Sequence, residues 1–589
     1  MKGLAPLVYL AATLAIAGPL LAPGYVFALD HGMGPRVADY YARYILSNDD
    51  AIQNKGAYAL LLAGLTALVP VWVAQKLILF APFFLAGYGA HTLASRRVGA
   101  GAAFFAGLVY MLSPFAYVRG VAGQTGVLWA YALAPWFLFA WLRALDGSRR
   151  AFAAAALVAF ATGVFQAHGL ALLALLVGVI ALVRLARDPR GWRAHAGRPA
   201  ALAAVLLLLN LAWIVPVALA PHTTLDNIGD ADREYFRTSA SGMPSVGVAV
   251  MSLQGFWRPG YESPFPSLWL LAVPATLLLL SVHGLRARRD PVSIALAISG
   301  VAGLVLALGA ASPLTAPVWD AAWDHVPLVK GFRDSQKLVA LLALAYADLG
   351  AAGADDLLRR LRAPRVPRAA PVVALAILLA LPLATAKPLV GGYDGQLGVA
   401  QFPEEWQAAQ DATAGCEGSM LALPWHLYLD QSWLPNDDKR VASPAKLYFS
   451  CPLVASDDVE AGGSAGKAGP PLDDLSAARI QYVLVLKEAD WRTQAKGLAE
   501  QRDLSLIVDN ARVQVWRNDA MEASGDGGPF HVRETHANAA LALWIVSGFS
   551  LVGIALLAAL PRRATSSYLP RLRLGPRLLA RWLVKQGPR

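Results

Sequence analysis

The sequence predicts an α-helical polytopic membrane protein of about 12 transmembrane helices, with a small extracytoplasmic α/β domain inserted before the last helix. Of its 589 residues, 56% are hydrophobic and 15% are charged, against about 25% charged in soluble domains. The apolar residues form runs of about 20, the length that a helix needs to cross a bilayer. Residues 389–535 carry 22 acids and 12 bases, a net charge of −10, which leaves +21 for the remainder. This composition excludes a cytosolic enzyme, a disordered chain and a disulfide-dense secreted scaffold.

Twelve apolar runs are predicted to be spans. They cover residues 4–28, 71–94, 98–117, 126–145, 151–165, 168–187, 199–219, 267–285, 291–310, 337–354, 369–387 and 537–560. With the N-terminus inside, the inner loops hold the arginine clusters. These lie at 96–97, 143–150, 187–198, 286–289 and 359–368. The positive-inside pattern predicts a plasma-membrane protein with both termini cytoplasmic, and it disfavours nucleic-acid binding as the reason for the positive charge.

Two stretches fit a simple crossing poorly. The segment 151–187 begins with only about 15 apolar residues, and Gln166, His168 and Gly169 interrupt it. It is either two short spans or a re-entrant pair whose backbone must be covered by protein or a water-filled cavity. Residues 57–69 are also short, which favours a helix lying in the outer interface. The first apolar run, at about 25 residues, is too long for a signal-peptide core and is read as a retained span.

The predicted outer side carries three loops, at 29–56, 220–266 and 311–336, which belong to a membrane domain of residues 1–387. Residues 388–536 are enough for one small domain. Their β-type runs are 419–423, 480–486, 504–508 and 513–516, the last two forming a hairpin around Asp509 and Asn510. Helices are expected near 403–413 and 489–502, and a flexible loop at 462–471. After the last span, 537–560, a tail at 561–589 carries eight Lys and Arg residues and no acid, and is predicted to be cytoplasmic.

The two cysteines of the chain, Cys416 and Cys451, both fall in the predicted outer domain. In an oxidising compartment they can form a disulfide. The alternative is a pair of buried free thiols. Two cysteines without clustered histidines do not make a zinc ribbon.

Asp30 follows the first apolar run, which places its carboxylate at the outer membrane surface. A carboxylate beside low-dielectric material can serve as a general base, although a solvated loop acid or a helix cap is the simpler alternative. The outer loops also supply cations that suit a lipid-phosphate leaving group. These are Arg119, Arg233, Arg237, Arg333 and Lys337. Snorkelling of basic side chains at helix ends explains each of them equally well.

Two polar residues stand inside predicted spans. His168 either lines a cavity or is a packed histidine with satisfied hydrogen bonds, and Asp348 is expected to pair with an inner-side arginine. The sequence has no nucleotide-binding loop, dinucleotide fingerprint, zinc-protease motif or nucleophile elbow. Any driving force must therefore come from an activated substrate carried by a lipid, or from a gradient.

Four features together resemble the polytopic GT-C glycosyltransferase-like proteins of prokaryotic membranes. The similarity is greatest to a branch near the mycobacterial-type arabinofuranosyltransferases and the multi-pass enzymes that glycosylate lipoteichoic acid. The features are Asp30 followed by an interface helix; residues 111–124 (MLSPFAYVRGVAGQ) with 130–136 (AYALAPW); residues 332–337 (FRDSQK) opening a span; and an outer domain with 423–426 (LPWH) and 481–487 (QYVLVLK).

The resemblance implies a polyprenyl-phosphate-linked sugar donor used on the outer face and a cell-envelope glycan or glycolipid acceptor. It implies an inverting displacement with a first-loop acid as base, here Asp30, with Asp39 as the substitute. Basic residues of the outer loops would hold the departing phosphate, and the region of Trp425 and His426 would help bind the acceptor. Many GT-C proteins carry two neighbouring acids in this loop. Here His31 follows Asp30, which leaves the part of a divalent cation (Mg, Mn or Ca) open.

Two other functions compete with a glycosyltransferase. A polysaccharide or lipid transporter predicts broken spans at matching positions in both halves of the chain. The only broken pair found is 151–187, with no counterpart in the second half. An inactive GT-C scaffold that binds glycolipid without turnover is the third hypothesis.

Overall fold

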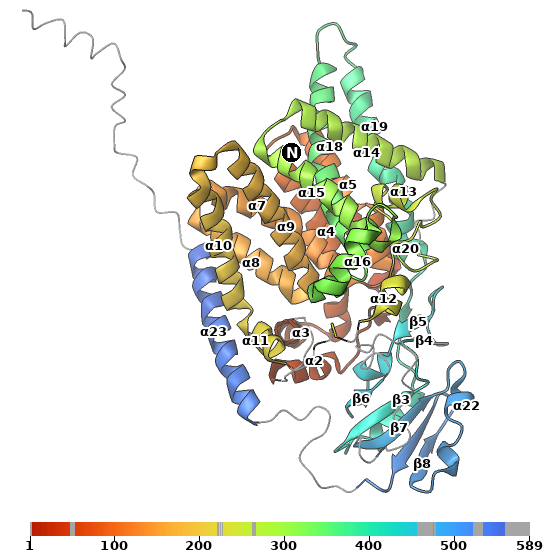
Figure 1. Ribbon diagram of the computed structural model, residues 1–589. Coiled ribbons are helices and arrows are strands. Elements are labelled where there is room, and N and C mark those ends of the chain that lie inside the picture. Colours follow the sequence, from red (N-terminus) through yellow and green to blue (C-terminus); the bar gives the residue numbers. More distant parts are fainter. Residues whose placement is uncertain are drawn as a thin grey trace, which may run out of the picture.

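The computed structural model describes residues 3–46, 54–220, 228–261, 267–455, 479–521 and 534–559, with 223, 225, 226 and 475 as single residues. A helical bundle carries a small domain with a β-sheet at one end (Figure 1). The predicted loop at 462–471 and the predicted tail at 561–589 lie outside the described residues.

Every predicted span contains helix, but two differ from the prediction. The first, 4–28, is helical only to Leu21, and Tyr25–Val26 within it is a strand. The span 199–219 is broken at Asn210, where its two helices are bent by 79°. The helices of the bundle are α1 (Leu4–Ala17) with η1 (Gly18–Leu21), α4 (Val71–Ala94), α5 (Ala100–Met111) with α6 (Pro114–Val121), α7 (Thr125–Leu145), α8 (Arg149–Phe165), α9 (Ala167–Arg187), α10 (Trp192–Leu209) with α11 (Leu211–Leu219), α14 (Ser267–Ala287), α15 (Pro291–Leu308), α18 (Val339–Arg360), α19 (Ala370–Ala384) and α23 (Glu534–Ala559). The chain is a multi-pass membrane protein. Among the described residues, eight helices are long and apolar enough to cross a membrane, or up to ten if each of two bent pairs is one span.

The segment 151–187 forms two helices, α8 and α9, that meet at Gln166. There the backbone is extended, with φ −159° and ψ 114°. The 17 residues of α8 span only about 25 Å, less than the roughly 30 Å hydrocarbon core. The other segment that fits a simple crossing poorly, 57–69, forms α3 (Lys55–Leu68). This helix packs on α2 (Val37–Leu46).

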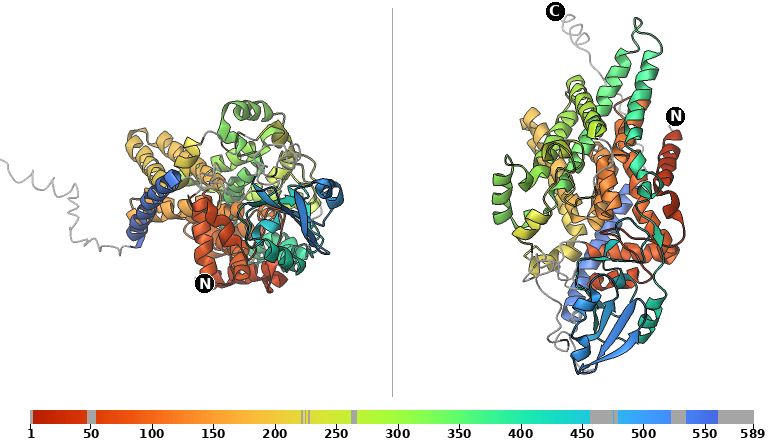
Figure 2. Two further views of the ribbon diagram at one scale, coloured as in Figure 1. Left: turned by 90° about the horizontal axis from the view of Figure 1, so that it is seen from below. Right: turned by 90° about the vertical axis from the view of Figure 1, so that its right-hand side faces the viewer.

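The helix α18 is the centre of the bundle, because almost all of it is buried. It packs against α14, α15 and α5. In the right-hand view of Figure 2, the bundle that surrounds it lies above the blue, sheet-bearing domain. Two glycines allow the closest of these contacts. A Cβ on Gly284 of α14 would collide with the backbone carbonyl of Leu349, and one on Gly353 of α18 with that of Leu280. Small residues commonly let membrane helices approach in this way.

Shorter helices lie in the connections between these spans and in the segment that leads to the sheet. They are α12 (Asp230–Tyr235), α13 (Val246–Met251), α16 (Ala316–His325), α17 (Pro327–Lys330), η4 (Ser335–Leu338) and α20 (Val390–Asp394). The connections of α12, α13, α16 and α17 correspond to the predicted outer loops 220–266 and 311–336.

The domain predicted to be extracytoplasmic, here named the outer domain after that prediction, is built on a five-stranded sheet of order β6-β3-β7-β9-β8. Its strands are β3 (Ser419–Leu423), β6 (Leu453–Val454), β7 (Ile480–Leu486), β8 (Leu504–Asp509) and β9 (Val513–Asn518). The strands β6, β3 and β7 are parallel, whereas β9 pairs antiparallel with β7 and β8. The helix α21 (Glu405–Ala412) contacts β8 and β9, and Trp406 on it is buried in the domain's core.

Two small two-stranded sheets connect the outer domain with the chain's first loop. β1 (Tyr25–Val26) pairs with β2 (Val399–Ala400), and β4 (Tyr428–Asp430) forms an antiparallel hairpin with β5 (Arg440–Ala442). Cys416 and Cys451 form a disulfide across 35 residues. Closing a loop of that size stabilises the domain by roughly 3–4 kcal/mol in the chain-entropy model.

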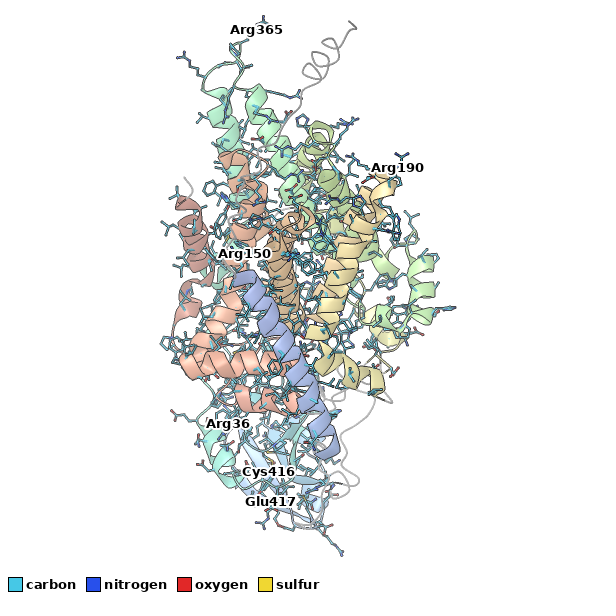
Figure 3. The ribbon with its side chains drawn as sticks, turned by 90° about the vertical axis from the view of Figure 1, so that its left-hand side faces the viewer. Arg36, Arg150, Arg190, Arg365, Cys416 and Glu417 are labelled. Carbon is cyan, nitrogen blue, oxygen red and sulfur yellow. A yellow bond between two sulfur atoms is a disulfide. The ribbon has the colours of Figure 1, made fainter. Side chains whose placement is uncertain are left out.

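The charge asymmetry of the sequence corresponds to the two ends of the molecule. Arg190 and Arg365 lie toward one end, and Cys416 and Glu417 of the outer domain lie at the opposite end (Figure 3). Near the arginine-rich end, Arg97 pairs with Asp348 at 2.6 Å, as the sequence predicts, and with Asp290 at 2.8 Å.

Candidate functional site

Asp30 lies in a tight turn after β1, and its side chain is exposed. Its backbone N–H donates to the carbonyl of Ala122 at 2.9 Å, which fixes the turn on the loop after α6. That close approach requires Gly123, which has φ +76° and where a Cβ would lie 2.6 Å from the Cβ of His31. The run 111–124, on which part of the resemblance rests, thus supplies the loop that contacts the turn of Asp30.

Both oxygens of the Asp30 carboxylate accept a hydrogen bond. Gln124 donates through Nε2 to Oδ2 at 2.8 Å, and the Tyr428 hydroxyl donates to Oδ1 at 2.7 Å. An ionised carboxylate has about four acceptor positions, so others remain for a substrate hydroxyl. The partners come from two distant parts of the chain, the loop before α7 and the hairpin β4–β5 of the outer domain.

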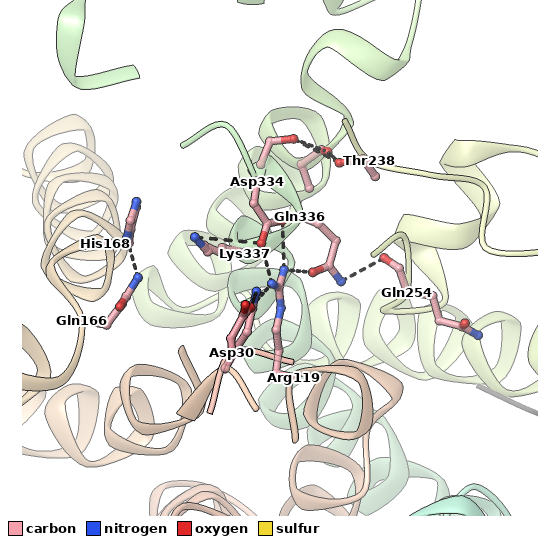
Figure 4. Close-up of polar contacts among 12 residues, drawn as sticks. Asp30, Arg119, Gln166, His168, Thr238, Gln254, Asp334, Gln336 and Lys337 are labelled. Carbon is pink, nitrogen blue, oxygen red and sulfur yellow. Dashed lines mark hydrogen bonds and ion pairs between the residues drawn. The ribbon is translucent and has the colours of Figure 1, made fainter. Parts of the chain in front are cut away.

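Arg119 of α6 lies beside this carboxylate but is engaged with partners of its own (Figure 4). Its side chain is 0% exposed and pairs with Asp334, at 2.5 Å to Oδ2 and 3.2 Å to Oδ1. It also donates to the amide oxygens of Gln124 and Gln336. Burial, the largest single influence, raises the pKa of the Asp334 carboxyl, but the charges of Arg119 and Lys337 and the Arg119 hydrogen bond together outweigh it and hold that pKa below its usual value.

Lys337, which precedes α18, carries the surplus positive charge of the cluster. Its Nζ is 3.9 Å from Asp334, and its side chain is 14% exposed. Asp334 thus balances only one of the two cations, Arg119 and Lys337. The Asp30 carboxylate is close enough for its charge to act on Lys337, and Figure 4 shows Lys337 joined to Asp334, with Asp30 and Arg119 beside that pair.

The other predicted cations have acidic partners of their own. Arg333 pairs with Asp232 at 3.2 Å. Arg233 pairs with Asp320 at 3.0 Å, and the exposed Arg237 with its neighbour Glu234. No contact found between described residues joins these three to Asp30. Arg333 immediately precedes Asp334 in the chain, and its charge acts on Lys337.

Asp39, the substitute base, belongs to a different pair. It stands in the first turn of α2, its side chain is 71% exposed, and it pairs with Arg36 at 3.2 Å. In the described parts of the chain, no hydrogen bond or ion pair joins Asp39 to Asp30 or Lys337.

Trp425 and His426 follow the carboxyl end of β3. Trp425 is buried against the outer domain's core. The half-exposed His426 places Nε2 at 2.9 Å from Asp490 and 2.9 Å from the Gln494 amide. Ligands commonly bind beyond the carboxyl ends of parallel strands. The same segment continues directly into Tyr428, so it connects this edge of the sheet with Asp30.

The two histidines near the site are packed residues. His31 is buried, and the Gln75 amide contacts its Nε2 at 3.2 Å. Burial, and secondarily the positive charge of Lys76, lowers the pKa of His31 to about 4. His168 lies between the Gln166 amide and the carbonyl of Gly331, which corresponds to the packed alternative.

For several residues, the sequence alone gives no sign that they belong to the site. Gln124, Asp334 and Gln336 stand in the runs that support the resemblance, but without an assigned role. Nothing in the sequence marks Tyr428 or Arg258, because their positions depend on tertiary contacts. Across the described ranges, no three His, Cys, Asp or Glu side chains gather closely enough to hold a metal ion.

Comparisons with known proteins identify the fold. No family model and no curated protein matches the sequence. Among solved structures, the mycobacterial arabinofuranosyltransferase AftD is similar, with TM-score 0.60 and 18% identity over 92% of this chain and 42% of AftD. A mutant form of AftD gives TM-score 0.55, and ArnT from Cupriavidus metallidurans gives 0.47. This chain therefore spans about two fifths of the length of AftD. The predicted resemblance is confirmed at the level of the fold alone: over most of its length, this chain is folded like the part of AftD that it matches.

Proposed function

We propose that the chain is a membrane glycosyltransferase that moves a sugar from a polyprenyl-phosphate donor to a cell-envelope glycan or glycolipid. The observation that carries this proposal is the exposed Asp30 carboxylate, held by two donors beside a cluster with surplus positive charge. A base and a cation in one place are the two groups that displacement of a phosphate by a hydroxyl requires. The likeness to a fold that includes an arabinofuranosyltransferase supports sugar transfer.

In the proposed reaction, Asp30 takes the proton of an acceptor hydroxyl as that oxygen attacks the anomeric carbon of the donor sugar. The bond between this carbon and the phosphate oxygen breaks on the opposite face. Its electron pair leaves with the polyprenyl phosphate, and the anomeric configuration inverts. The attack needs no nucleotide, because the lipid phosphate is the activated leaving group.

Lys337 is proposed to stabilise the departing phosphate directly. It is partly exposed and not fully balanced, whereas Arg119 is enclosed by Asp334, Gln124 and Gln336. Arg119 is therefore proposed to act by holding Asp334 in place and by keeping the cluster positive. Arg333, Arg233 and Arg237 are each paired with an acid, so no direct contact with the phosphate is proposed for them.

The acceptor is proposed to approach along the outer domain, past His426. The donor's lipid lies in the bilayer, so the reacting hydroxyl must come from the aqueous side. The end of β3 leads to the Asp30 partner Tyr428 and borders that approach. The buried Trp425 fixes this end of the strand and does not itself offer a stacking surface.

The test is transfer by purified protein in nanodiscs, with a panel of radiolabelled polyprenyl-phosphate pentoses and hexoses and envelope glycolipids as acceptors. We expect Asp30→Asn to lower kcat by about 100-fold or more, in the range that general-base catalysis contributes. Asp39→Asn, the same substitution on the exposed partner of Arg36, should retain activity within about two-fold.

Full activity of Asp30→Asn would remove the base assignment. Binding of polyprenyl phosphate without turnover of any donor would instead indicate a glycolipid-binding scaffold. A parallel assay in EDTA tests whether activity requires a divalent cation. Because the described site contributes one carboxylate to an ion, we expect activity to persist in EDTA.

A further inference from the structure

The hairpin β4–β5 belongs to the outer domain but is attached to the loop that carries Asp30. The backbone N–H of Ala442 donates to the carbonyl of Leu29 at 3.1 Å, immediately before Asp30. The side chain of Asn436, in the hairpin's connection, donates to the carbonyl of Phe27 at 2.7 Å and accepts from the N–H of Gly398 at 2.9 Å. The hairpin and the first loop are therefore held together from both ends of the hairpin.

Tyr428 is fixed on its other side by Arg258. The centre of the Arg258 guanidinium lies 5.3 Å from the Tyr428 ring and 5.9 Å from the Tyr261 ring. Arg258 is itself buried, and it pairs with Asp438 of the hairpin's connection at 3.8 Å. The ring of Tyr428 thus packs on a cation that the same hairpin anchors, so the hydroxyl is presented to Asp30 in one orientation.

Asp30 depends on this support because it stands on an exposed turn. Gln124 holds only Oδ2, and its amide oxygen accepts from Arg119. Without a donor on Oδ1, the carboxylate can rotate about its Cβ–Cγ bond. A misplacement of about 1 Å in a catalytic group can cost about 100-fold in rate.

We propose that Tyr428 is a positioning residue for the Asp30 base, so that the outer domain completes the catalytic site. This inference rests on the proposed function. The Tyr428 hydroxyl keeps one carboxylate oxygen fixed, Gln124 keeps the other fixed, and the remaining lone pairs face the acceptor hydroxyl. Tyr428 itself exchanges no proton with the substrates.

The chain offers a closely matched control in Tyr261. Both tyrosines place their rings beside Arg258, and both hydroxyls donate to an aspartate, Tyr428 to Asp30 at 2.7 Å and Tyr261 to Asp438 at 3.0 Å. Tyr428→Phe and Tyr261→Phe therefore remove the same group from the same aromatic cluster. The two variants differ in which carboxylate loses its donor.

We expect Tyr428→Phe to lower kcat by about 10- to 100-fold while the donor KM changes less than two-fold. Tyr261→Phe should leave both constants within two-fold, and both variants should melt within a few degrees of the parent. In the Asp30→Asn background, Tyr428→Phe should have no further effect, since it acts through that carboxylate.

Unchanged kcat in Tyr428→Phe, with a large loss in Asp30→Asn, would overturn the inference and leave the proposed function standing. Equal losses in the two tyrosine variants would also overturn it, because they would indicate a purely structural cluster. Unchanged activity in both Tyr428→Phe and Asp30→Asn would remove the base assignment and this inference with it, whereas the absence of transfer by the parent protein from every donor would overturn the proposed function itself.

Discussion

At the scale of single residues, the site is organised by what each charge is paired with. A buried ion is costly unless it is paired and hydrogen-bonded, which explains why Arg119 has Asp334 and two amide oxygens around it. The sequence shows the cations of the outer loops but not their partners. Asp334 lies 215 residues from Arg119, so no local pattern reveals the pair. Lys337 is the cation of this cluster whose charge Asp334 does not fully balance.

The buried His31 leads to a prediction about how the stability of the folded protein depends on pH. Its pKa is about 4 in the folded protein, against an ordinary value of 6.5 that the unfolded chain would have. As pH falls from about 6.5 toward 4, the unfolded state binds a proton that the folded state does not. Stability is therefore complete above about 6.5 and declines below it, by about 2 kcal/mol at pH 5. We expect the melting temperature to fall between pH 8 and pH 5 because of this residue.

The comparison that isolates His31 is the variant His31→Gln, in which Gln keeps a polar side chain near Gln75 but does not titrate. Melting in nanodiscs at pH 8, 6.5 and 5 should show a smaller drop for the variant than for the parent. Parallel melting curves for the two proteins would show that His31 does not titrate differently in the folded state.

At the scale of elements, the sequence predicts those helices and strands that depend on interactions between residues close together in the chain. Apolar runs of membrane length become helices because every backbone polar group must be satisfied within the bilayer. The predicted helix 489–502 is instead divided into α22 (Trp491–Gln494) and η8 (Leu498–Glu500). Gly497 adopts φ +96° between them, a left-handed conformation that ends a helix. The docking of β4–β5 on the first loop has no local signal, since it depends on contacts across the fold.

The contact between α14 and α18 gives a prediction at this scale. Gly353→Ala would drive a methyl group into the carbonyl of Leu280, where backbone cannot yield easily. We expect a loss of stability of about 1–3 kcal/mol, the usual cost of overpacking. Activity should fall as well, because α18 begins just after Lys337.

Gly178→Ala is the matched control, because Gly178 also lies within a membrane helix, α9, but a Cβ at this position would have nothing within 4 Å. Its melting temperature should equal that of the parent or exceed it slightly. Equal melting of Gly353→Ala and the parent would mean that the two helices are farther apart than their backbones indicate.

At the scale of the whole molecule, the distribution of charge along the sequence matches the division of the fold into two opposite ends. The arginine clusters predict one end to be cytoplasmic, and the acidic outer domain lies at the other (Figure 3). Hydropathy predicted the bundle well, because each span is a local feature. The way in which Asp30, Lys337 and Tyr428 meet could not be predicted, because they come from three regions that only the folded bundle brings together.

Sidedness can be measured directly, because the only two cysteines of the chain form the disulfide and no native thiol competes for a label. Glu500→Cys places an exposed thiol on the outer domain, and Arg365→Cys places one in the connection between α18 and α19. In intact cells, a membrane-impermeant maleimide should label Glu500→Cys, and Arg365→Cys only after permeabilisation. Labelling of Arg365→Cys in intact cells would reverse the topology. Since Tyr428 joins Asp30 to the outer domain, the side on which Glu500→Cys reacts is also the side on which the proposed donor would have to present its sugar.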